Sequence, residues 1–391
     1  MRVAHLSLTN FRNYAAAEVP FEAGPNLFVG RNGQGKTNLI ESLGYLSTLG
    51  SHRVSTDQAL IQQGFDAAVI RARVQNDARE ALVEVQLNRT GANRAQVNRS
   101  AIRPRELPRY FSSVLFAPED LALIRGEPGV RRRFMDQLLV QRNPRLAGVL
   151  SDYERVLKQR NTLLKSVRAA GLKGAQLSTL DIWDERLVSL GAEIIDARAS
   201  LIERLRGPLS VAYHSVVGDD HSPRLGEQLS ILGGDPDEIE IVAFSAPAYS
   251  EAELKDTARD SPSRFRESLA RLRPRELERG LTLVGPHRDD VIFELNGLPA
   301  KGYASHGESW SFALSLKLAA AELLRRESAT GDPVLILDDV FAELDQGRRK
   351  KLASAIGDYE QVLITAAVLD DVPGELTSHS VRIDSGAVVD D

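Results

Sequence analysis

The sequence predicts an α/β fold whose sheet-containing core is divided into two parts by a mainly helical insertion. A stretch with the pattern G-x-x-x-x-G-K-[ST] spans residues 30–37, between an apolar strand at 26–29 and an amphipathic helix at 37–49. Near the other end of the chain, the apolar run 334–337 ends at Asp338 and Asp339. Between these regions, apolar residues recur at helical spacing over a long stretch that begins near Gly129.

Composition limits the possible classes of protein. The chain has 391 residues, enough for two or three domains with substantial cores. Lys plus Arg number 49 and Asp plus Glu 54, so the net charge of −5 gives no overall indication of nucleic-acid binding, although a local basic face can still bind phosphates. The absence of cysteine excludes disulfides and thiolate metal sites. Without a membrane-span-length apolar run or a signal-peptide core, the chain is expected to be cytoplasmic and to have no membrane partner.

The N-terminal part is predicted to consist mainly of strands. Residues 2–10 alternate between apolar and polar positions, and residues 18–21 form a second strand that turns into the strand at 26–29. Consecutive strands between residues 67 and 98 and a short apolar strand at 114–116 complete this part. An antiparallel start followed by strand, loop and helix differs from a plain parallel nucleotide-binding domain.

The middle of the chain is predicted to be helical. Two helices between residues 129 and 195, joined at a turn near Gly171 and Gly174, form a packed arm rather than a long coiled coil. Residues 218–237 form a loop region with at most one short strand. Strands at 282–284, 291–295, 334–337 and 362–364 follow, with a helix at 308–326. The predicted domains are 1–120 and 270–391 for the two parts of the core and 121–269 for the helical arm.

The glycine-rich stretch is suited to binding the phosphates of a nucleotide. Its glycines let the backbone wrap closely around phosphate oxygens, and the following helix adds its positive N-terminal end. Lys36 supplies a cation for the β- and γ-phosphates, and the hydroxyl of Thr37 is a hard oxygen ligand suited to Mg²⁺. The alternative, a glycine-rich turn that fits the pattern by chance, is disfavoured by the strand and helix on either side. The residues predicted to bind nucleotide here are Gly30, Arg31, Asn32, Gly33, Gln34, Gly35, Lys36 and Thr37.

Two acidic residues and a helix start extend the predicted site. Of Asp338 and Asp339, one carboxylate can bind Mg²⁺ and the other can orient or deprotonate an attacking water. The alternative is a pair of helix-capping aspartates, and the phosphate loop favours the catalytic interpretation. Ser305 and Glu308 fit a capping box. Ser305 and the N–H of Gly307 can also form an anion site at a helix N-terminus, facing a phosphate held by another subunit.

Six blocks of residues, spread in order over nearly the whole chain, carry a resemblance to a known family. They are residues 8–14, 35–41, 116–121, 131–136, 285–290 and 337–345. With them the chain resembles the ABC-type ATPase heads of the SMC class, and among these most closely the RecF family of bacterial recombination mediators. The ATPase motifs are shared by a broad superfamily. The arginine-rich block 131–136 and the run Pro286-His287-Arg288-Asp289 are more specific to the RecF family.

The resemblance implies an ATP-dependent clamp in which two heads sandwich two ATP molecules. Each ATP would lie on the phosphate loop of one subunit and against residues 305–308 of the other. Lys36 would bind phosphate, and Thr37 and Asp338 would hold Mg²⁺. The other implied roles are Asp339 as general base, Glu119 as sensor of the γ-phosphate, Arg12 and Asn13 along the nucleotide, and Ser305, Gly307 and Asp345 toward the dimer interface.

The resemblance also implies a role in DNA metabolism. Family members bind double-stranded DNA and junctions between single- and double-stranded DNA at gaps, as an ATP-bound dimer. With RecR and RecO they help to load RecA in repair, replication restart and SOS induction. Two departures matter: Ser305-His306-Gly307-Glu308 stands where many members have Ser-Gln-Gly-Gln, and residues 364–367 lack the switch histidine of transporter ATPases. We therefore expect a weak, Mg²⁺-dependent ATPase that is used as a switch.

Other functions can also be built on an ATPase head. The missing switch histidine and the long helical insertion disfavour the ATPase subunit of a transporter. An ATPase of a nuclease complex usually carries a further metal-binding domain after the head, for which the residues after Asp345 are expected to be too few. Intact Lys36, Thr37, Asp338 and Asp339 disfavour a scaffold that binds ATP without hydrolysing it.

Two arginine-rich regions are possible DNA contacts. The first comprises Arg103, Arg105, Arg109, Arg125, Arg131, Arg132 and Arg133, and the second Arg264, Arg266, Arg271, Arg273, Arg275 and Arg279. Interspersed glutamates favour a solvated helix face with i,i+4 ion pairs for the second region. Residues 131–133 are expected to have an interior or interface role at least as much as to contact DNA. Contacts to the DNA backbone alone would be salt-dependent and nearly independent of sequence.

Overall fold

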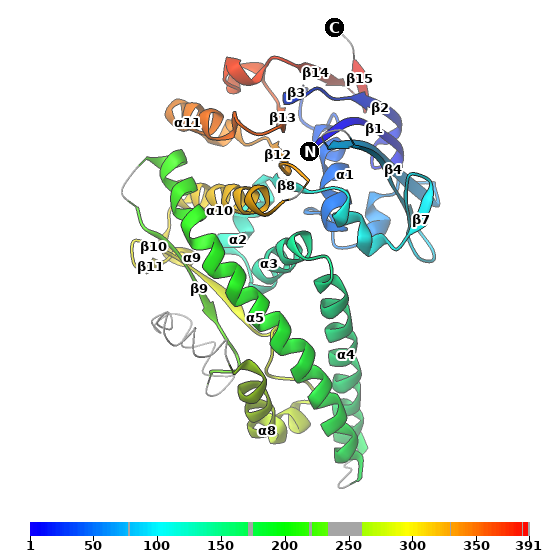
Figure 1. Cartoon of the computed structure of the whole chain (residues 1–391), viewed down its shortest axis with the longest axis vertical. Helices are drawn as coiled ribbons and strands as arrows, with labels where there is room; N and C mark the ends of the chain where they lie inside the picture. Colours follow the sequence, from blue (N-terminus) through cyan, green and yellow to red (C-terminus); the bar gives the residue numbers. More distant parts are fainter. Residues whose placement is uncertain are drawn as a thin grey trace. The chain divides into compact units, whose positions relative to one another are not determined.

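The computed structural model describes residues 1–76, 79–170, 175–218, 221–233, 260–328, 330–384 and 386–389 (Figure 1). The chain divides into two compact units, which are described separately. Unit 1 comprises Met1–Ile124, Gly207–His221 and Ser305–Asp391, and unit 2 comprises Arg125–Arg206 and Ser222–Ala304. The domain limits that the sequence predicts at residues 120 and 270 remain a prediction.

An antiparallel sheet of six strands forms one layer of unit 1, in the order β2-β1-β4-β5-β6-β7. Its strands are β1 (Arg2–Phe11), β2 (Tyr14–Pro20), β4 (Ala67–Asn76), β5 (Arg79–Asn88), β6 (Arg94–Val97) and β7 (Ser100–Ile102). Alternate residues of β4 are buried, because successive side chains of a strand point to opposite faces and one face covers the core. The predicted antiparallel start is confirmed, although the second strand begins at Tyr14 rather than at Glu18.

The second sheet of unit 1 also has six strands, in the order β15-β14-β3-β13-β12-β8, and is parallel except for the β14–β15 pair. Its strands are β3 (Gly24–Val29), β8 (Ser113–Phe116), β12 (Val334–Asp338), β13 (Gln361–Ala366), β14 (Ser380–Asp384) and β15 (Ala387–Val389). Every residue of β12 and β13 is buried, as in a parallel sheet covered on both faces. The strands predicted at 26–29, 114–116, 334–337 and 362–364 are confirmed.

Helix α1 (Lys36–Thr48) lies in the hydrophobic core between the two sheets of unit 1 (Figure 1). Leu39, Ile40, Leu43 and Leu46 are fully buried and belong to one cluster with residues of β1, β4 and β12. This cluster fixes the helix at the end of β3. Helix α10 (His306–Glu327) precedes β12 and packs Trp310 against Phe116 of β8, with ring centroids 4.2 Å apart. Helix α11 (Gln346–Ile356) follows β12.

Unit 2 is mainly helical. Its helices are α3 (Pro128–Arg142), α4 (Leu146–Ala170), the part of α5 (Ala175–Val217) up to Arg206, α8 (Ser261–Arg279) and α9 (Ala300–Tyr303). The short helix α2 (Leu121–Arg125) precedes them. A small antiparallel sheet in the order β11-β10-β9 completes the unit, with β9 (Pro223–Gln228), β10 (Asp290–Leu295) and β11 (Leu298–Pro299). Among the described residues, no helix combines the length and the apolar composition needed to cross a membrane.

Two predictions for this part of the chain are wrong. Helix α5 is 43 residues long, not a short segment, because Leu201, Leu205 and Leu209 keep helical spacing and burial through the Gly207-Pro208 pair. Residues 282–284 form no strand. The N–H of Leu283 donates to a carboxylate oxygen of Glu276 at 2.8 Å and not to the carbonyl of a neighbouring strand. The turn predicted at 171 and 174, and the loop beyond residue 233, lie outside the described residues.

Candidate nucleotide-binding site

The glycine-rich loop connects β3 to α1 in unit 1. Gly33 and Gly35 have φ angles of 82° and 116°, which residues with a Cβ rarely adopt. A Cβ on Gly35 would lie 2.7 Å from the side-chain nitrogen of Asn13 and 2.9 Å from the hydroxyl of Tyr14, whereas nothing lies within 4 Å of a Cβ on Gly33. Gly35 therefore allows close packing against the β1–β2 turn, and Gly33 lies beside open space.

Lys36 is the first residue of α1 and is only 3% exposed. Its Nζ donates hydrogen bonds to the carbonyl oxygens of Gly30 at 2.8 Å and Arg31 at 3.4 Å. The ammonium group is therefore held by the loop's own carbonyl oxygens. An anion on this loop would meet a buried positive charge together with the N-terminus of α1.

Strand β12 places Asp338 beside the start of α1. The hydroxyls of Thr37 and Thr365 both donate to Oδ1 of Asp338, at 3.1 and 2.5 Å. Burial raises the pKa of Asp338 to about 6, with the charge of Asp339 adding to the rise and the hydrogen bonds from the two threonines opposing it. Residues from opposite ends of the chain thus form one arrangement, as the sequence predicts for Thr37 and Asp338.

Asp339 follows in a left-handed conformation, with φ of 51°. Its N–H donates to the hydroxyl of Thr365 at 2.9 Å, and its Oδ1 is buried without a hydrogen-bond partner among the described residues. Such an oxygen is costly unless water or a cation satisfies it. Neither aspartate caps a helix here, because the short 3₁₀ helix after β12 is preceded by Val340.

Glu119 lies in the same acidic neighbourhood. Its negative charge contributes to the raised pKa of Asp338, and its own side chain is partly exposed. Oε1 of Glu119 lies 3.8 Å from Nε of Arg53, a residue of the loop that follows α1. The predicted catalytic residues Lys36, Asp338, Asp339 and Glu119 therefore all belong to unit 1.

Arg12 and Asn13 occupy the turn between β1 and β2. Nη2 and Nε of Arg12 donate to the two carboxylate oxygens of Glu41 on α1, at 2.7 and 2.9 Å. Nδ2 of Asn13 donates to the carbonyl of Gln34 at 3.3 Å, and its Oδ1 accepts from Asn38 at 2.7 Å. Both side chains thus brace the loop and the start of α1, and Arg12 is paired with Glu41.

Ser305 and Glu308 form the predicted capping box at the start of α10. Oγ of Ser305 accepts from the N–H of Glu308 at 3.3 Å, and a carboxylate oxygen of Glu308 accepts from the N–H of Ser305 at 2.8 Å. Hydrogen bonds with Ser305 lower the pKa of Glu308. The capping interpretation of Glu308 is therefore confirmed. Contacts of exposed Ser305 and its neighbour Gly307 with a second subunit stay a prediction.

Asp345 caps the start of α11 in the same way. Its carboxylate accepts from the N–H of Arg348 at 3.0 Å, and this bond lowers the pKa of Asp345. The side chain remains 65% exposed. An exposed carboxylate with a depressed pKa stays charged over the physiological range, and its predicted place at a dimer interface is untested.

Three residues make contacts that sequence reasoning did not assign. Glu41 pairs with Arg12, Thr365 joins Asp338 to Asp339, and the hydroxyl of Tyr14 donates to the carbonyl of Gly35 at 3.1 Å. For Thr365 the available signal was a polar residue directly after the apolar run 362–364, because buried polar groups nearly always have a partner. Glu41 lies in an amphipathic helix with several polar residues, where its position gives no such signal.

The groups of this site fit a nucleotide with a divalent cation. The loop and the buried Lys36 suit phosphate oxygens. The hydroxyl of Thr37 and the carboxylate of Asp338 are the hard oxygen ligands that Mg²⁺ prefers, and nucleotide-bound Mg²⁺ is usually held by one or two such protein groups together with phosphates and water. The unpartnered oxygen of Asp339 and the raised pKa of Asp338 indicate a carboxylate pair that a cation would stabilise.

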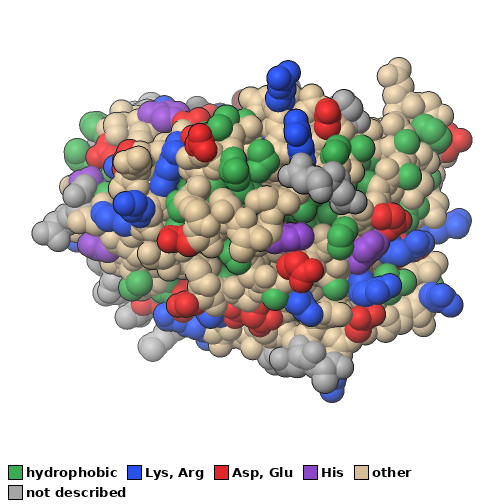
Figure 2. Space-filling view, turned by 90° about the horizontal axis from the view of Figure 1, so that it is seen from above, with side chains coloured by type: hydrophobic (Ala, Val, Ile, Leu, Met, Phe, Trp, Pro, Cys, Tyr) green, Lys and Arg blue, Asp and Glu red, His purple; other side chains and the backbone are tan. Residues whose placement is uncertain are grey.

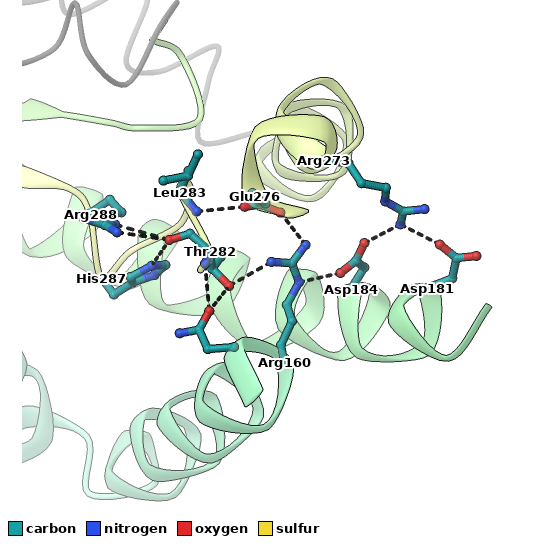
Figure 3. Close-up of polar contacts among 10 residues, drawn as sticks. Arg160, Asp181, Asp184, Arg273, Glu276, Thr282, Leu283, His287 and Arg288 are labelled. Carbon is teal, nitrogen blue, oxygen red and sulfur yellow. Dashed lines mark hydrogen bonds and ion pairs between the residues drawn. The ribbon is translucent and has the colours of Figure 1, made fainter. Parts of the chain in front are cut away.

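The second arginine-rich region lies on α8 of unit 2 and is tied to α5. Arg266 pairs with Glu185 at 2.7 Å. Arg273 pairs with Asp181 and Asp184 at 2.5 and 2.6 Å (Figure 3). The region is therefore engaged in ion pairs, as the sequence favours. The pairs run between two helices, however, and not at i,i+4 along one helix.

A fully buried arginine of α4 joins this network. Arg160 donates from Nε to Asp184 at 2.6 Å, from Nη1 to the hydroxyl of Thr282 at 2.8 Å, and from Nη2 to Glu276 at 2.6 Å. Figure 3 shows these partners converging from α5, α8 and the loop after α8. Each guanidinium nitrogen thus has an acceptor, which is the condition for burying this charge at acceptable cost.

The first arginine-rich region is divided between the two units. In unit 2, Arg131 is 4% exposed and pairs with both carboxylate oxygens of Asp290 at 2.7 and 2.8 Å. Arg132 donates to the carbonyl of Asp289 at 2.7 Å, whereas Arg133 is exposed. The interior role expected here is confirmed for Arg131. The proximity of Arg109 and Arg131 in the sequence therefore does not make them one surface.

In unit 1, five exposed arginines lie between residues 94 and 109, on β6, before the edge strand β7 and in the segment that follows β7. We call Arg94, Arg99, Arg103, Arg105 and Arg109 the arginine strip. Among the described residues, none of these five guanidinium groups has an acceptor. Figure 2, which labels no single residue, shows one face of the molecule on which Lys and Arg side chains at the right-hand end are interspersed with acidic and histidine side chains. The strip thus presents positive charge that the fold does not use internally.

Comparison with known proteins defines the class. The model of the "RecF/RecN/SMC N terminal domain" family matches residues 2–373. A crystal structure of an SMC head bound to the C-winged helix domain of ScpA shares the fold, with a TM-score of 0.52 at 15% identity over 99% of this chain and 96% of that one. The fold and the phosphate loop therefore define an ABC-type ATPase head of the SMC class, as the sequence predicts.

Within this class the chain belongs to the RecF family. It is 70% identical over 392 residues to the DNA replication and repair protein RecF of Leifsonia xyli subsp. xyli, covering 100% of both chains. It is 52% identical over 392 residues to the protein of that name from Streptomyces avermitilis, covering 99% of both. A solved structure of the recombination mediator protein RecF-ATP in the RecFOR pathway matches with a TM-score of 0.85 at 28% identity, over 99% of this chain and 96% of that one.

Proposed function

We propose that this chain is an ATP-dependent DNA-binding recombination mediator in DNA repair, replication restart and SOS induction. One observation within unit 1 carries the proposal. Thr37, the last residue of the phosphate loop, is hydrogen-bonded to Asp338, and Thr365 joins Asp338 to Asp339. Membership of the RecF family supports it, as does the similarity to a solved structure described as RecF-ATP.

In this function the loop residues and Lys36 bind the phosphates of ATP. Thr37 and Asp338, which already share a hydrogen bond, hold Mg²⁺. A Mg²⁺ ion held by these two residues would neutralise charge on the phosphate oxygens. Asp339 accepts a proton from the attacking water, and its buried, unpartnered oxygen is suited to this because no other hydrogen bond within the described residues competes for it. Arg12 and Asn13 keep the loop and α1 in place.

Hydrolysis is weak and serves as a switch. Thr365 belongs to residues 364–367, which stand where transporter ATPases have their switch histidine, and its hydroxyl donates to Asp338 and accepts from the N–H of Asp339. It therefore orders the two aspartates and provides no ionisable group. In this proposal ATP acts mainly to join two heads. Glu119 senses the γ-phosphate, and the exposed Ser305, the neighbouring Gly307 and the exposed Asp345 face the second subunit.

The dimer binds double-stranded DNA and the junctions between single- and double-stranded DNA. The arginine strip supports this part of the proposal, since its side chains are exposed and have no acceptors among the described residues. Contacts from such arginines to phosphates are independent of sequence and weaken as salt rises. The cytoplasmic partners are RecR with RecO, through which RecA is loaded, in line with the RecFOR pathway named for the solved relatives.

The test is sedimentation of the protein with short gapped DNA, with and without ATP and Mg²⁺. Wild type should form dimers and bind DNA only when ATP and Mg²⁺ are present. Lys36→Ala should lose both, because the phosphates then lack their buried cation. Lys158→Ala, an exposed lysine of α4 in unit 2, is the matched control and should behave like wild type.

A monomer indifferent to ATP contradicts the clamp. DNA binding that survives Lys36→Ala separates the nucleotide site from the DNA function and also contradicts it. Co-sedimentation with RecR in the same experiment tests the partner, because an ATP-bound dimer that ignores RecR supports a different ATPase assembly.

A further inference from the structure

The C-terminal hairpin β14–β15 lies against the phosphate loop. Strand β14 pairs in parallel with β3, the strand that leads into the loop, with Arg382 opposite Val29. Gly386, directly before β15, reaches the loop itself, where its N–H donates to the carbonyl of Gln34 at 2.9 Å. Ile383 of β14 is buried in the same core cluster as α1, so the hairpin is anchored beside the loop.

The carbonyl of Gln34 receives a second hydrogen bond from the β1–β2 turn. Nδ2 of Asn13 donates to it at 3.3 Å, and Asn13 is itself held by Asn38 of α1 at 2.7 Å. In a planar trans peptide, the C=O and the following N–H point in opposite directions. Fixing the carbonyl of Gln34 on the hairpin side therefore directs the N–H of Gly35 away from the hairpin.

The contact depends on glycine at two positions. Gly386 has a φ of 76°, and a Cβ there would lie 2.9 Å from Nδ2 and 3.0 Å from the carbonyl oxygen of Asn13. A Cβ on Gly30, the first loop residue, would collide with the backbone carbonyl of Ile383. The hairpin thus touches the loop near its beginning and near its end, with no room for side chains at either contact.

We propose that this hairpin is a working part of the nucleotide site, with Gly386 as a positioning residue. By holding the carbonyl of Gln34, it sets the peptide that aims the N–H of Gly35 at the phosphates. Because the identity of the ligand rests on the proposed function, the test includes a measurement on the protein without nucleotide.

The variant is Gly386→Val, and the matched control is Gly91→Val. Gly91 also has a positive φ, of 84°, but nothing lies within 4 Å of a Cβ there, so it reproduces the backbone strain without a contact to the loop. Hydrogen–deuterium exchange of residues 30–37 is measured without nucleotide, and ATP affinity by titration. We expect faster exchange and roughly tenfold weaker ATP binding only in Gly386→Val, because one hydrogen bond is broken and the peptide is displaced. Gly386→Ala, with a single added methyl, serves if the valine variant does not fold.

The inference is overturned if both variants at position 386 exchange residues 30–37 at the wild-type rate and bind ATP with wild-type affinity. Losses of equal size in Gly91→Val also overturn it, because they trace to general destabilisation. A wild-type protein that binds no ATP contradicts the proposed function instead. The exchange rates of residues 30–37 then still decide whether the hairpin holds the loop.

Discussion

The arginine strip of unit 1 and the buried arginines of unit 2 differ in what surrounds them. In unit 2, Arg160 is fully buried and meets Asp184, Thr282 and Glu276 with its three nitrogens. Arg131, 4% exposed, is paired with both oxygens of Asp290. In unit 1, the five guanidinium groups of the strip are exposed and have no acceptor among the described residues.

The difference follows from the cost of removing charge from water. A buried guanidinium is tolerated only where carboxylates and hydroxyls replace its hydration, so each such arginine is committed to the fold. An exposed one keeps its hydration and contributes little to stability, and its charge remains available to a partner. The number of arginines in a stretch of sequence therefore does not identify a nucleic-acid surface. Exposed arginines without internal acceptors are better candidates for DNA contacts.

The largest expected effect is that of Arg160→Ala on stability. The substitution leaves Glu276 in a buried cavity without its cation, and Asp184 with Arg273 alone, which should lower the free energy of unfolding by about 3–5 kcal/mol. Urea denaturation measures it. Arg266→Ala is the control, since its pair with Glu185 is exposed at 51% and 60% of the two side chains and should cost less than about 1 kcal/mol.

An equal loss of unfolding free energy in Arg160→Ala and Arg266→Ala would contradict the comparison. It would mean that burial does not distinguish the ion pairs of unit 2. DNA binding should be unchanged in Arg266→Ala, because this arginine is already paired within the fold.

The next effect concerns a buried carboxyl group that, within the described part of the chain, has no hydrogen bond to an arginine. Glu227 of β9 is 5% exposed, and burial raises its pKa to about 8, with Asp289 adding to the rise and Arg198 and Arg206 opposing it. The folded protein therefore holds this proton more tightly than the unfolded chain. The stability that the proton contributes is complete below the ordinary pKa of 4.5 and is lost as pH rises through about 8.

Glu227→Gln should remove this pH dependence, because the amide stays neutral. Between about pH 5 and about pH 8.5, the free energy of unfolding of wild type should fall by a few kcal/mol relative to that of the variant. Urea denaturation at both values gives the difference, in which groups common to both proteins largely cancel. Parallel pH profiles for the two proteins would contradict the raised pKa of Glu227.

Local patterns were sufficient for the parts of the site that are local. The phosphate loop lies between a strand and a helix that the periodicity of residues 26–49 predicts, and Ser305 with Glu308 forms a capping box defined by spacing alone. The contact of Thr37 with Asp338 could be predicted because both belong to motifs that act together.

Contacts that only the tertiary fold creates could not be predicted. Nothing in the sequence near Gly386 indicates that its N–H meets Gln34, and Arg160 resembles any exposed arginine of an amphipathic helix. The length of α5 was missed because Gly207 and Pro208 are helix-breaking locally, whereas buried Leu205 and Leu209 maintain the helix. Arg109 and Arg131 looked like one basic region because sequence distance says nothing about burial.

The smallest expected effect on stability, and the sharpest test of the comparison, is the double substitution Arg103→Ala with Arg105→Ala. Because neither side chain has an acceptor among the described residues, the free energy of unfolding should change by less than about 0.5 kcal/mol. Binding to double-stranded DNA in the presence of ATP should nevertheless weaken. The slope of the logarithm of the binding constant against that of salt concentration should fall by roughly 1 for each phosphate that the variant no longer neutralises.

The salt slope decides between two explanations of a weaker complex. Removing arginines that neutralise phosphates lowers both the affinity and the slope, whereas a disturbed ATP site lowers the affinity at every salt concentration and leaves the slope unchanged. Measuring ATP affinity in the same variant separates the two. If DNA affinity and slope both match wild type, Arg103 and Arg105 are solvated side chains that do not neutralise DNA phosphates. The DNA contacts must then come from other basic side chains, among them exposed Arg133 of unit 2, and the comparison of the two units loses its functional meaning.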